Sequence, residues 1–223
     1  MGGGGKGDGR QVAVRCWRQL SSQRTVDRDI RICFVGDSFV NGTGDETALG
    51  WAGRLCAKAS GMGLPLTYYN LGVRRDTSRD ILLRWESECS RRLPDTCDSR
   101  IVVSCGVNDT VIENNQPRVA HEESLDHVRQ MLRAARKYLL IMVGPPPVAD
   151  APHNERIHRL SDAFAQEAKK LDVNYIDLYS SLVAQNDYMQ GLADGDGAHP
   201  GVKGYEMMAD IIGASRSWWF HAN

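Results

Sequence analysis

The feature that most constrains the fold of this chain is a regular alternation of short apolar runs with longer amphipathic segments. Apolar runs of strand length occupy residues 30–35, 66–71, 101–105, 138–143 and 173–178. Segments with apolar side chains at helical spacing occupy residues 48–60, 78–93, 119–137, 155–171 and 202–215. Strands joined by helices predict an α/β fold with a parallel sheet and right-handed crossovers. Because the runs are apolar on both sides, we expect helices on both faces of the sheet.

The pattern also predicts the topology and the domain organisation. Five strands of this kind favour the flavodoxin-like order 2-1-3-4-5. The chain has 223 residues, which suits one domain with a sizeable core. The Gly-rich and then polar segment 1–28 is predicted to be a flexible N-terminal extension, and residues 29–223 are predicted to form the folded domain.

Composition and charge exclude several classes of function. The formal net charge is −1, without the clustered positive excess of nucleic-acid binders, so no nucleic-acid partner is expected. The arginine pairs 74–75 and 91–92 are interpreted as solvated surface. No stretch approaches the ~20 apolar residues that span a bilayer, and no signal peptide is visible, so we expect a cytoplasmic protein. The oligomeric state is left open.

The six cysteines include no C-x-x-C pair, so we expect neither a disulfide framework nor a metal site. Histidines 121 and 127 lie six residues apart on a predicted helix and do not share a face as a metal-binding pair would, and histidines 153 and 158 are interpreted as helix surface. The apolar end Trp218-Trp219-Phe220 is compatible with docking on the domain, with a partner contact or with a frayed end.

Small and polar residues follow the predicted strands, where open parallel sheets bind their ligands. Gly36-Asp37-Ser38 follows the first strand, Gly72 the second, and Gly106-Val107-Asn108-Asp109 the third. Asp196-Gly197-Ala198-His199 precedes the last helix. The topology therefore predicts that these segments meet at one edge of the sheet.

These residues provide the groups that ester hydrolysis requires. Ser38 is the candidate nucleophile, and His199 is the candidate base because an imidazole titrates near neutral pH. Asp196, three residues before His199, is favoured over Asp194 as the carboxylate that orients the ring. The candidate oxyanion donors are the backbone N–H groups of Ser38 and Gly72 and the side-chain amide of Asn108. Asp37 and Asp109 are interpreted as supporting residues.

The four segments resemble, in order, the four sequence blocks of the SGNH hydrolases, also called GDSL-type esterases and lipases. The resemblance extends from about residue 30 to the end of the chain. It implies a three-layer α/β/α sandwich, a Ser38–Asp196–His199 triad, donors at Ser38, Gly72 and Asn108, and no metal or organic cofactor. Two positions depart from the family pattern, with Phe39 in place of leucine and Val107 in place of threonine.

The sequence therefore predicts a serine hydrolase that cleaves small-molecule carboxylic esters with short acyl groups. A thioesterase, a lysophospholipase or a carbohydrate deacetylase would use the same residues. A flavodoxin-like module that binds a ligand without catalysis is the alternative from another class, and a hydrolase that has become a binding protein is a further one.

Overall fold

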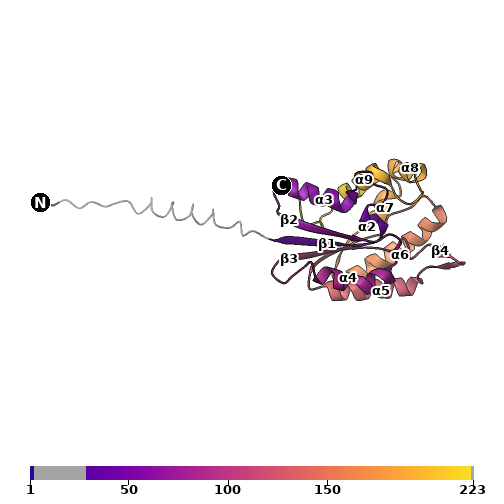
Figure 1. The fold of residues 1–223 in the computed structure, drawn as a ribbon, viewed down its shortest axis with the longest axis horizontal. Coiled ribbons are helices and arrows are strands. Elements are labelled where there is room, and N and C mark those ends of the chain that lie inside the picture. Colours follow the sequence, from indigo (N-terminus) through magenta and orange to yellow (C-terminus); the bar gives the residue numbers. More distant parts are fainter. Residues whose placement is uncertain (3–28, 222–223) are drawn as a thin grey trace.

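The computed structural model describes residues 1–2 and 29–221 of the chain (Figure 1). Apart from its first two residues, the predicted extension 1–28 lies outside the described residues. Its separation from the domain at residue 29 stays a prediction.

The predicted five-stranded parallel sheet is confirmed. Its strands are β1 (Ile30–Gly36), β2 (Leu66–Gly72), β3 (Asp98–Ser104), β6 (Leu139–Val143) and β7 (Asn174–Ile176). They lie in the order β2-β1-β3-β6-β7, which is 2-1-3-4-5 when the strands of this sheet are numbered along the chain. Gly36, the last residue of β1, is in register with Gly72 and Ser104, so three strands end side by side.

Helices cover both faces of the sheet and give three layers (Figure 1). One layer contains α3 (Gly50–Gly61), α7 (Leu178–Leu182), α8 (Asn186–Asp194) and α9 (Gly201–Ala214). The opposite layer contains α4 (Ser78–Ser90), α5 (His121–Ala135) and α6 (Ala151–Lys170). A single-turn helix, α2 (Ser38–Asn41), begins directly after β1.

Alternating side chains of the strands build two separate cores. In β1, Ile32 and Phe34 pack with α3 and α9, whereas Cys33 and Val35 pack with α4 and α5. Each fully buried side chain of this size contributes about 1.5–3 kcal/mol of transfer free energy. The expectation that all strands are buried on both sides is wrong for β2, where Tyr68 is 38% exposed, because β2 lies at the edge of the sheet.

Several local features were not predicted from the sequence, among them the helices α7 and α8 between β7 and α9. The strands β4 (Ile112–Glu113) and β5 (Gln116–Pro117) form a small antiparallel hairpin apart from the main sheet. Its turn residues Asn114 and Asn115 both have positive φ, 51° and 63°, as tight hairpin turns require. Helix α6 begins at Ala151 rather than at residue 155, because the carboxylate of Asp150 caps it.

The apolar C-terminal segment docks on the domain, which decides among the three expectations for it. Trp218 is 3% and Phe220 is 8% exposed, and the guanidinium of Arg100 lies 5.1 Å from the ring centroid of Trp219. Within the described ranges, the cysteines are free thiols and no cluster of side chains with metal-ligating potential occurs. No helix of the described residues is long and apolar enough to cross a bilayer.

Candidate active site

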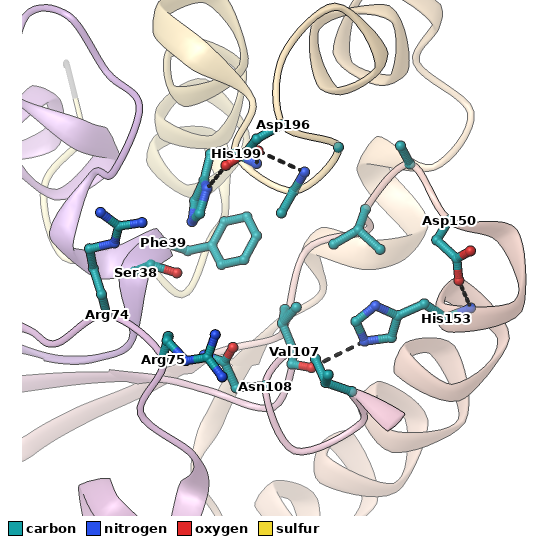
Figure 2. Close-up of a pocket in the computed structure, with 15 residues that line it drawn as sticks. Ser38, Phe39, Arg74, Arg75, Val107, Asn108, Asp150, His153, Asp196 and His199 are labelled. Carbon is teal, nitrogen blue, oxygen red and sulfur yellow. Dashed lines mark hydrogen bonds and ion pairs between the residues drawn. The ribbon is translucent and has the colours of Figure 1, made fainter. Parts of the chain in front are cut away.

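A pocket of about 620 Å³ opens at the carboxyl ends of the central strands. Figure 2 shows how segments from distant parts of the chain meet around it. Its lining residues are Ser38, Phe39, Arg74, Arg75, Val107, Asn108, Val111, Val148, Ala149, Asp150, His153, Asp196, Gly197, Ala198 and His199. The structure thus gathers Ser38, Asn108, Asp196 and His199 around one cavity.

The turn that carries Ser38 is fixed by close packing around β1. A Cβ atom on Gly36 would lie 2.2 Å from the carbonyl oxygen of Ser104, so a larger residue cannot occupy this position. Asp37 then caps α2, since its Oδ1 accepts the N–H of Phe39 at 2.9 Å. Ser38 is the first residue of this helix, and its N–H therefore has no partner within the helix. Gly42, with φ of 84°, ends α2 one turn later.

His199 is held by Asp196 from the same loop. The Nδ1 atom of His199 lies 2.6 Å from Oδ2 of Asp196. The other carboxylate oxygen, Oδ1, accepts the backbone N–H groups of Ala198 and His199 at 2.9 and 2.8 Å. Partial burial opposes ionisation, but these hydrogen bonds prevail and lower the pKa of Asp196 to about 2. Asp194, the alternative considered, instead accepts a hydrogen bond from Gln190 and does not contact His199.

The imidazole of His199 is also packed from behind. The ring of Phe39 lies 5.4 Å from it between centroids, and the Cβ atom that Gly44 lacks would lie 3.2 Å from the Cβ of His199. The Nε2 atom of His199 is buried and has no hydrogen-bond partner among the described residues. The side chain of His199 is 12% exposed and that of Asp196 is 57% exposed. Phe39, the departure from the family pattern, thus contacts the candidate base directly.

Asp37 and Asp109 lie behind the pocket as buried carboxyl groups. Burial, reinforced by the nearby Asp109 and Asp76, raises the pKa of Asp37 to about 7. Oδ1 of Asp109 accepts the N–H of Ser78 at 2.7 Å, while its Oδ2 has no partner in the described part of the chain. Asp37 and Asp109 thus each accept a backbone N–H beside the pocket, and their supporting role stays a prediction.

Asn108 is oriented by the loop that follows β2. Its Nδ2 donates to the carbonyl oxygen of Asp76 at 3.0 Å and makes a longer contact of 3.4 Å with Oδ2 of Asp37. The carboxylate of Asp76 is in turn held by Arg84, whose Nη2 also donates to the carbonyl oxygen of Gly36. This network connects the ends of β1, β2 and β3.

Gly72 is placed differently from its predicted role. It is not among the residues that line the pocket, and its N–H donates to Oδ1 of Asn70 at 3.0 Å. A Cβ atom at this position would lie 2.2 Å from the backbone nitrogen of Asn41. The observed requirement for glycine is therefore close packing against the turn of α2, and its N–H would reach an oxyanion only after leaving Asn70.

Two arginines of the pocket were interpreted from the sequence as solvated surface. Arg74 and Arg75 are exposed, as that interpretation expects, and they also line the rim of the cavity. Arg75 pairs with Glu113 of the β4–β5 hairpin at 3.2 Å and has φ of 69°, a conformation that side chains other than glycine rarely adopt. Their position directly after β2, where open parallel sheets bind ligands, is the sequence feature that could have indicated a place on the pocket.

His153 was interpreted as a helix-surface residue, and the structure shows that this is wrong. It lines the pocket, and its Nε2 lies 3.2 Å from the carbonyl oxygen of Val107 and 2.9 Å from Oγ of Thr110 (Figure 2). The loop just before α6 is hydrogen-bonded to the loop that carries Asp196 and His199, since the N–H of Ala149 donates to the carbonyl oxygen of Gly197 at 2.8 Å. The sequence signal for His153 was an Asp-x-x-His spacing that repeats the spacing of Asp196 and His199.

A serine at the start of a helix lies on the same pocket as an aspartate–histidine pair, which is an arrangement typical of serine hydrolases. The sequence model described as the GDSL-like Lipase/Acylhydrolase family matches residues 34–207. The chain belongs to this family, as its four blocks predicted.

Solved structures support the fold assignment. Axe2, an acetylxylan esterase from Geobacillus stearothermophilus, is similar with a TM-score of 0.70 and 20% identity over 82% of this chain and 92% of that one. The lipase/acylhydrolase from Enterococcus faecalis is similar with a TM-score of 0.69 and 22% identity over 82% of this chain and 93% of that one. Comparison with curated protein sequences finds no match.

Proposed function

We propose that this enzyme hydrolyses small-molecule carboxylic esters with short acyl groups through an acyl-enzyme on Ser38. The observation that carries the proposal is the His199 imidazole, whose Nδ1 is held by Asp196 at 2.6 Å while its Nε2 remains unpartnered beside the pocket that Ser38 lines. A base held in this way is ready to accept a proton from a hydroxyl group on its free side.

In the proposed reaction, Oγ of Ser38 attacks the ester carbonyl carbon and His199 takes the hydroxyl proton. Asp196 stabilises the resulting imidazolium through the Nδ1 contact. His199 then gives the proton to the departing alcohol, and water releases the acid by the same steps in reverse. The chain, the ester and one water molecule supply every group in these steps.

The developing oxyanion is proposed to receive the N–H of Ser38 and one hydrogen of the Asn108 amide, which would exchange its long 3.4 Å contact with Oδ2 of Asp37 for the oxyanion. The other amide hydrogen stays with the carbonyl oxygen of Asp76, which keeps the group aimed. Each such donor is worth roughly 3–4 kcal/mol of the barrier. Gly72 was the third predicted donor, but its N–H already donates to Asn70. In the proposed function, Gly72 therefore only allows the turn of α2 to pack closely against β2.

Hydrolysis of p-nitrophenyl acetate, butyrate and octanoate by the wild type and by Ser38→Ala tests the proposal. We expect the variant to lose at least about 10³-fold in kcat/KM with an unchanged circular dichroism spectrum. Ser90→Ala, an exposed serine at the end of α4, is the matched control and should retain activity. Equal rates for Ser38→Ala and wild type would contradict the nucleophile, and faster turnover of octanoate than of butyrate would contradict the short-chain preference.

The alternatives within the same chemistry are distinguished by the leaving group. A panel of an acyl thioester, a lysophospholipid and an acetylated xylo-oligosaccharide separates thioesterase, lysophospholipase and deacetylase activity. The last substrate is included because Axe2, which shares this fold, is an acetylxylan esterase. A scan for bound flavin absorbance tests the non-catalytic alternative.

A further inference from the structure

The second histidine of the pocket, His153, presents two ring edges with different surroundings. One edge carries Nε2, which faces the carbonyl oxygen of Val107 and Oγ of Thr110. The other edge carries Nδ1, which has no hydrogen-bond partner among the described residues. Figure 2 shows this nitrogen on the side of the ring turned away from the Val107 oxygen. His153 lines the same cavity as Ser38 and His199.

The surroundings of Nε2 determine where the proton of the ring resides. A carbonyl oxygen only accepts hydrogen bonds, so the contact with Val107 requires a hydrogen on Nε2. Oγ of Thr110 donates its own hydrogen to the same carbonyl oxygen at 2.9 Å, and it therefore also accepts from His153. The neutral ring with its hydrogen on Nε2 leaves Nδ1 with a free lone pair.

Burial of the ring favours its neutral form. Burial lowers the pKa of His153, and the cationic Arg156 acts in the same direction. The hydrogen bond to Val107 and the charge of Asp150 act in the opposite direction, but burial is the largest effect and the pKa stays lowered. An uncharged ring with an exposed acceptor nitrogen is therefore the state that meets a substrate.

The ring is not needed to satisfy the polar groups behind it. The carbonyl oxygen of Val107 already accepts the hydroxyl of Thr110. What only the histidine adds is the acceptor on its outer edge.

We propose that His153 is a specificity-determining residue that accepts a hydrogen bond at Nδ1 from a hydroxyl group of the substrate. The proposal rests on the proposed esterase function and narrows its substrates to esters that carry a free hydroxyl near the ester bond. The hydroxyl belongs to the alcohol part or to the acyl part of the ester, and the test separates the two.

Two matched ester pairs provide the test, with acid release measured by pH-stat titration. Butyl acetate and 3-hydroxybutyl acetate differ by a hydroxyl on the alcohol part. Ethyl butyrate and ethyl 3-hydroxybutyrate differ by a hydroxyl on the acyl part. A neutral hydrogen bond is worth about 0.5–1.5 kcal/mol, so we expect wild type to favour the hydroxylated member of one pair by about 3- to 10-fold in kcat/KM.

Two variants of His153 test the contributions of its two ring nitrogens separately. The amide of His153→Gln reaches the position of Nε2 and keeps the contacts with Val107 and Thr110, but it leaves no acceptor at Nδ1. The shorter His153→Asn places an acceptor near Nδ1. We expect His153→Gln to bring the ratio of hydroxylated to unhydroxylated ester to about 1, and His153→Asn to restore part of the ratio.

A nitrogen NMR spectrum of the imidazoles provides a readout independent of activity and should show His153 with its proton on Nε2. A proton on Nδ1 would overturn the proposal, as would a ratio that is the same in wild type and His153→Gln. If Ser38→Ala remains active, or if wild type cleaves none of the four esters, the esterase proposal fails and this one with it. If Ser38→Ala is inactive but the ratio does not respond to His153, only the present inference fails.

Discussion

Two segments of this protein have the same Asp-x-x-His spacing and line the same pocket, yet they use it in opposite ways. In the segment 196–199, the aspartate holds the histidine ring through Nδ1 and leaves Nε2 free. In the segment 150–153, the aspartate binds only the backbone N–H of the histidine, and the ring holds Nε2 inward and leaves Nδ1 free.

The backbone explains the difference. Gly197, with φ of 81°, lets the first segment curl so that one carboxylate reaches two N–H groups and the ring. Asp150 instead stands at the start of a regular helix, α6, with Pro152 in its first turn. There the carboxylate caps the helix and the ring points sideways to a neighbouring loop. A short motif therefore specifies chemistry only together with the conformation that carries it.

The largest expected difference is between the two histidines. His199→Ala should lower kcat/KM for p-nitrophenyl acetate by about 10⁴-fold or more, because the base of the reaction is lost. His153→Ala should stay within about tenfold of wild type for this ester, which has no hydroxyl to recognise. Steady-state rates of both variants, after a check of their folding by circular dichroism, measure the contrast. Similar losses in the two variants would mean that the assignment of a single base is wrong.

Replacement of Asp196 should lower activity more than replacement of Asp150, and this contrast should be smaller than the contrast between the two histidines. Asp196→Ala should lower kcat/KM by about 10²- to 10⁴-fold, since the ring loses the carboxylate that orients it and stabilises its charge. Asp150→Ala should change it by less than about twofold. Steady-state assays at one pH provide the test, and an active Asp196→Ala variant would argue against this dyad.

A third aspartate, Asp37, extends the comparison because its ionisation makes the stability of the protein depend on pH. Asp37 caps a helix as Asp150 does, but burial raises its pKa to about 7 from an ordinary value of 3.8. Between these pH values the folded protein holds a proton that the unfolded chain has released, so this group makes stability fall as the pH rises from about 4 to 7. Asn also caps helices and does not ionise.

We therefore expect Asp37→Asn to gain stability relative to wild type by about 1–4 kcal/mol between pH 4 and pH 8. Urea unfolding at pH 4, 6 and 8 measures the difference between the two proteins. Asp150→Asn is the control at an exposed cap. A difference between Asp37→Asn and wild type that does not change with pH would contradict the raised pKa.

The smallest expected effect is on the stability of α6. Asp150→Ala removes the acceptor for the N–H of His153 and should cost about 1 kcal/mol in free energy of unfolding. Asp150→Asn should retain most of that stability. Thermal or urea unfolding of the two variants is the measurement, and equal loss in both would show that the charge rather than the cap matters.

The sheet and its order were predictable because each element leaves a local period in the sequence, and β1 with its following turn is an example. The contact of Asp196 with His199 was predictable for the same reason, since three residues separate them. The engagement of Gly72 by Asn70 was not, because it depends on how the edge strand turns after β2. The role of the residues in catalysis stays a prediction.

His153 was misjudged for a different reason. Its neighbours along α6 are polar, which indicates an exposed face, but its ring reaches Val107, a residue 46 positions earlier in the chain. The spacing of apolar residues indicates which side of a helix is buried. It does not indicate which side chains lie beyond the carboxyl ends of the strands. Such contacts appear only when the strands are assembled.

The hydrogen bond from Ala149 to Gly197 has a consequence for any redesign of this pocket. It closes the loop after β6 and the loop before α9 into one continuous wall. An insertion in either loop would pull the other out of line and carry His199 away from Ser38. Among the described residues, no hydrogen bond of this kind joins the β4–β5 hairpin to the wall, so a change in the length of its turn would leave the wall in place.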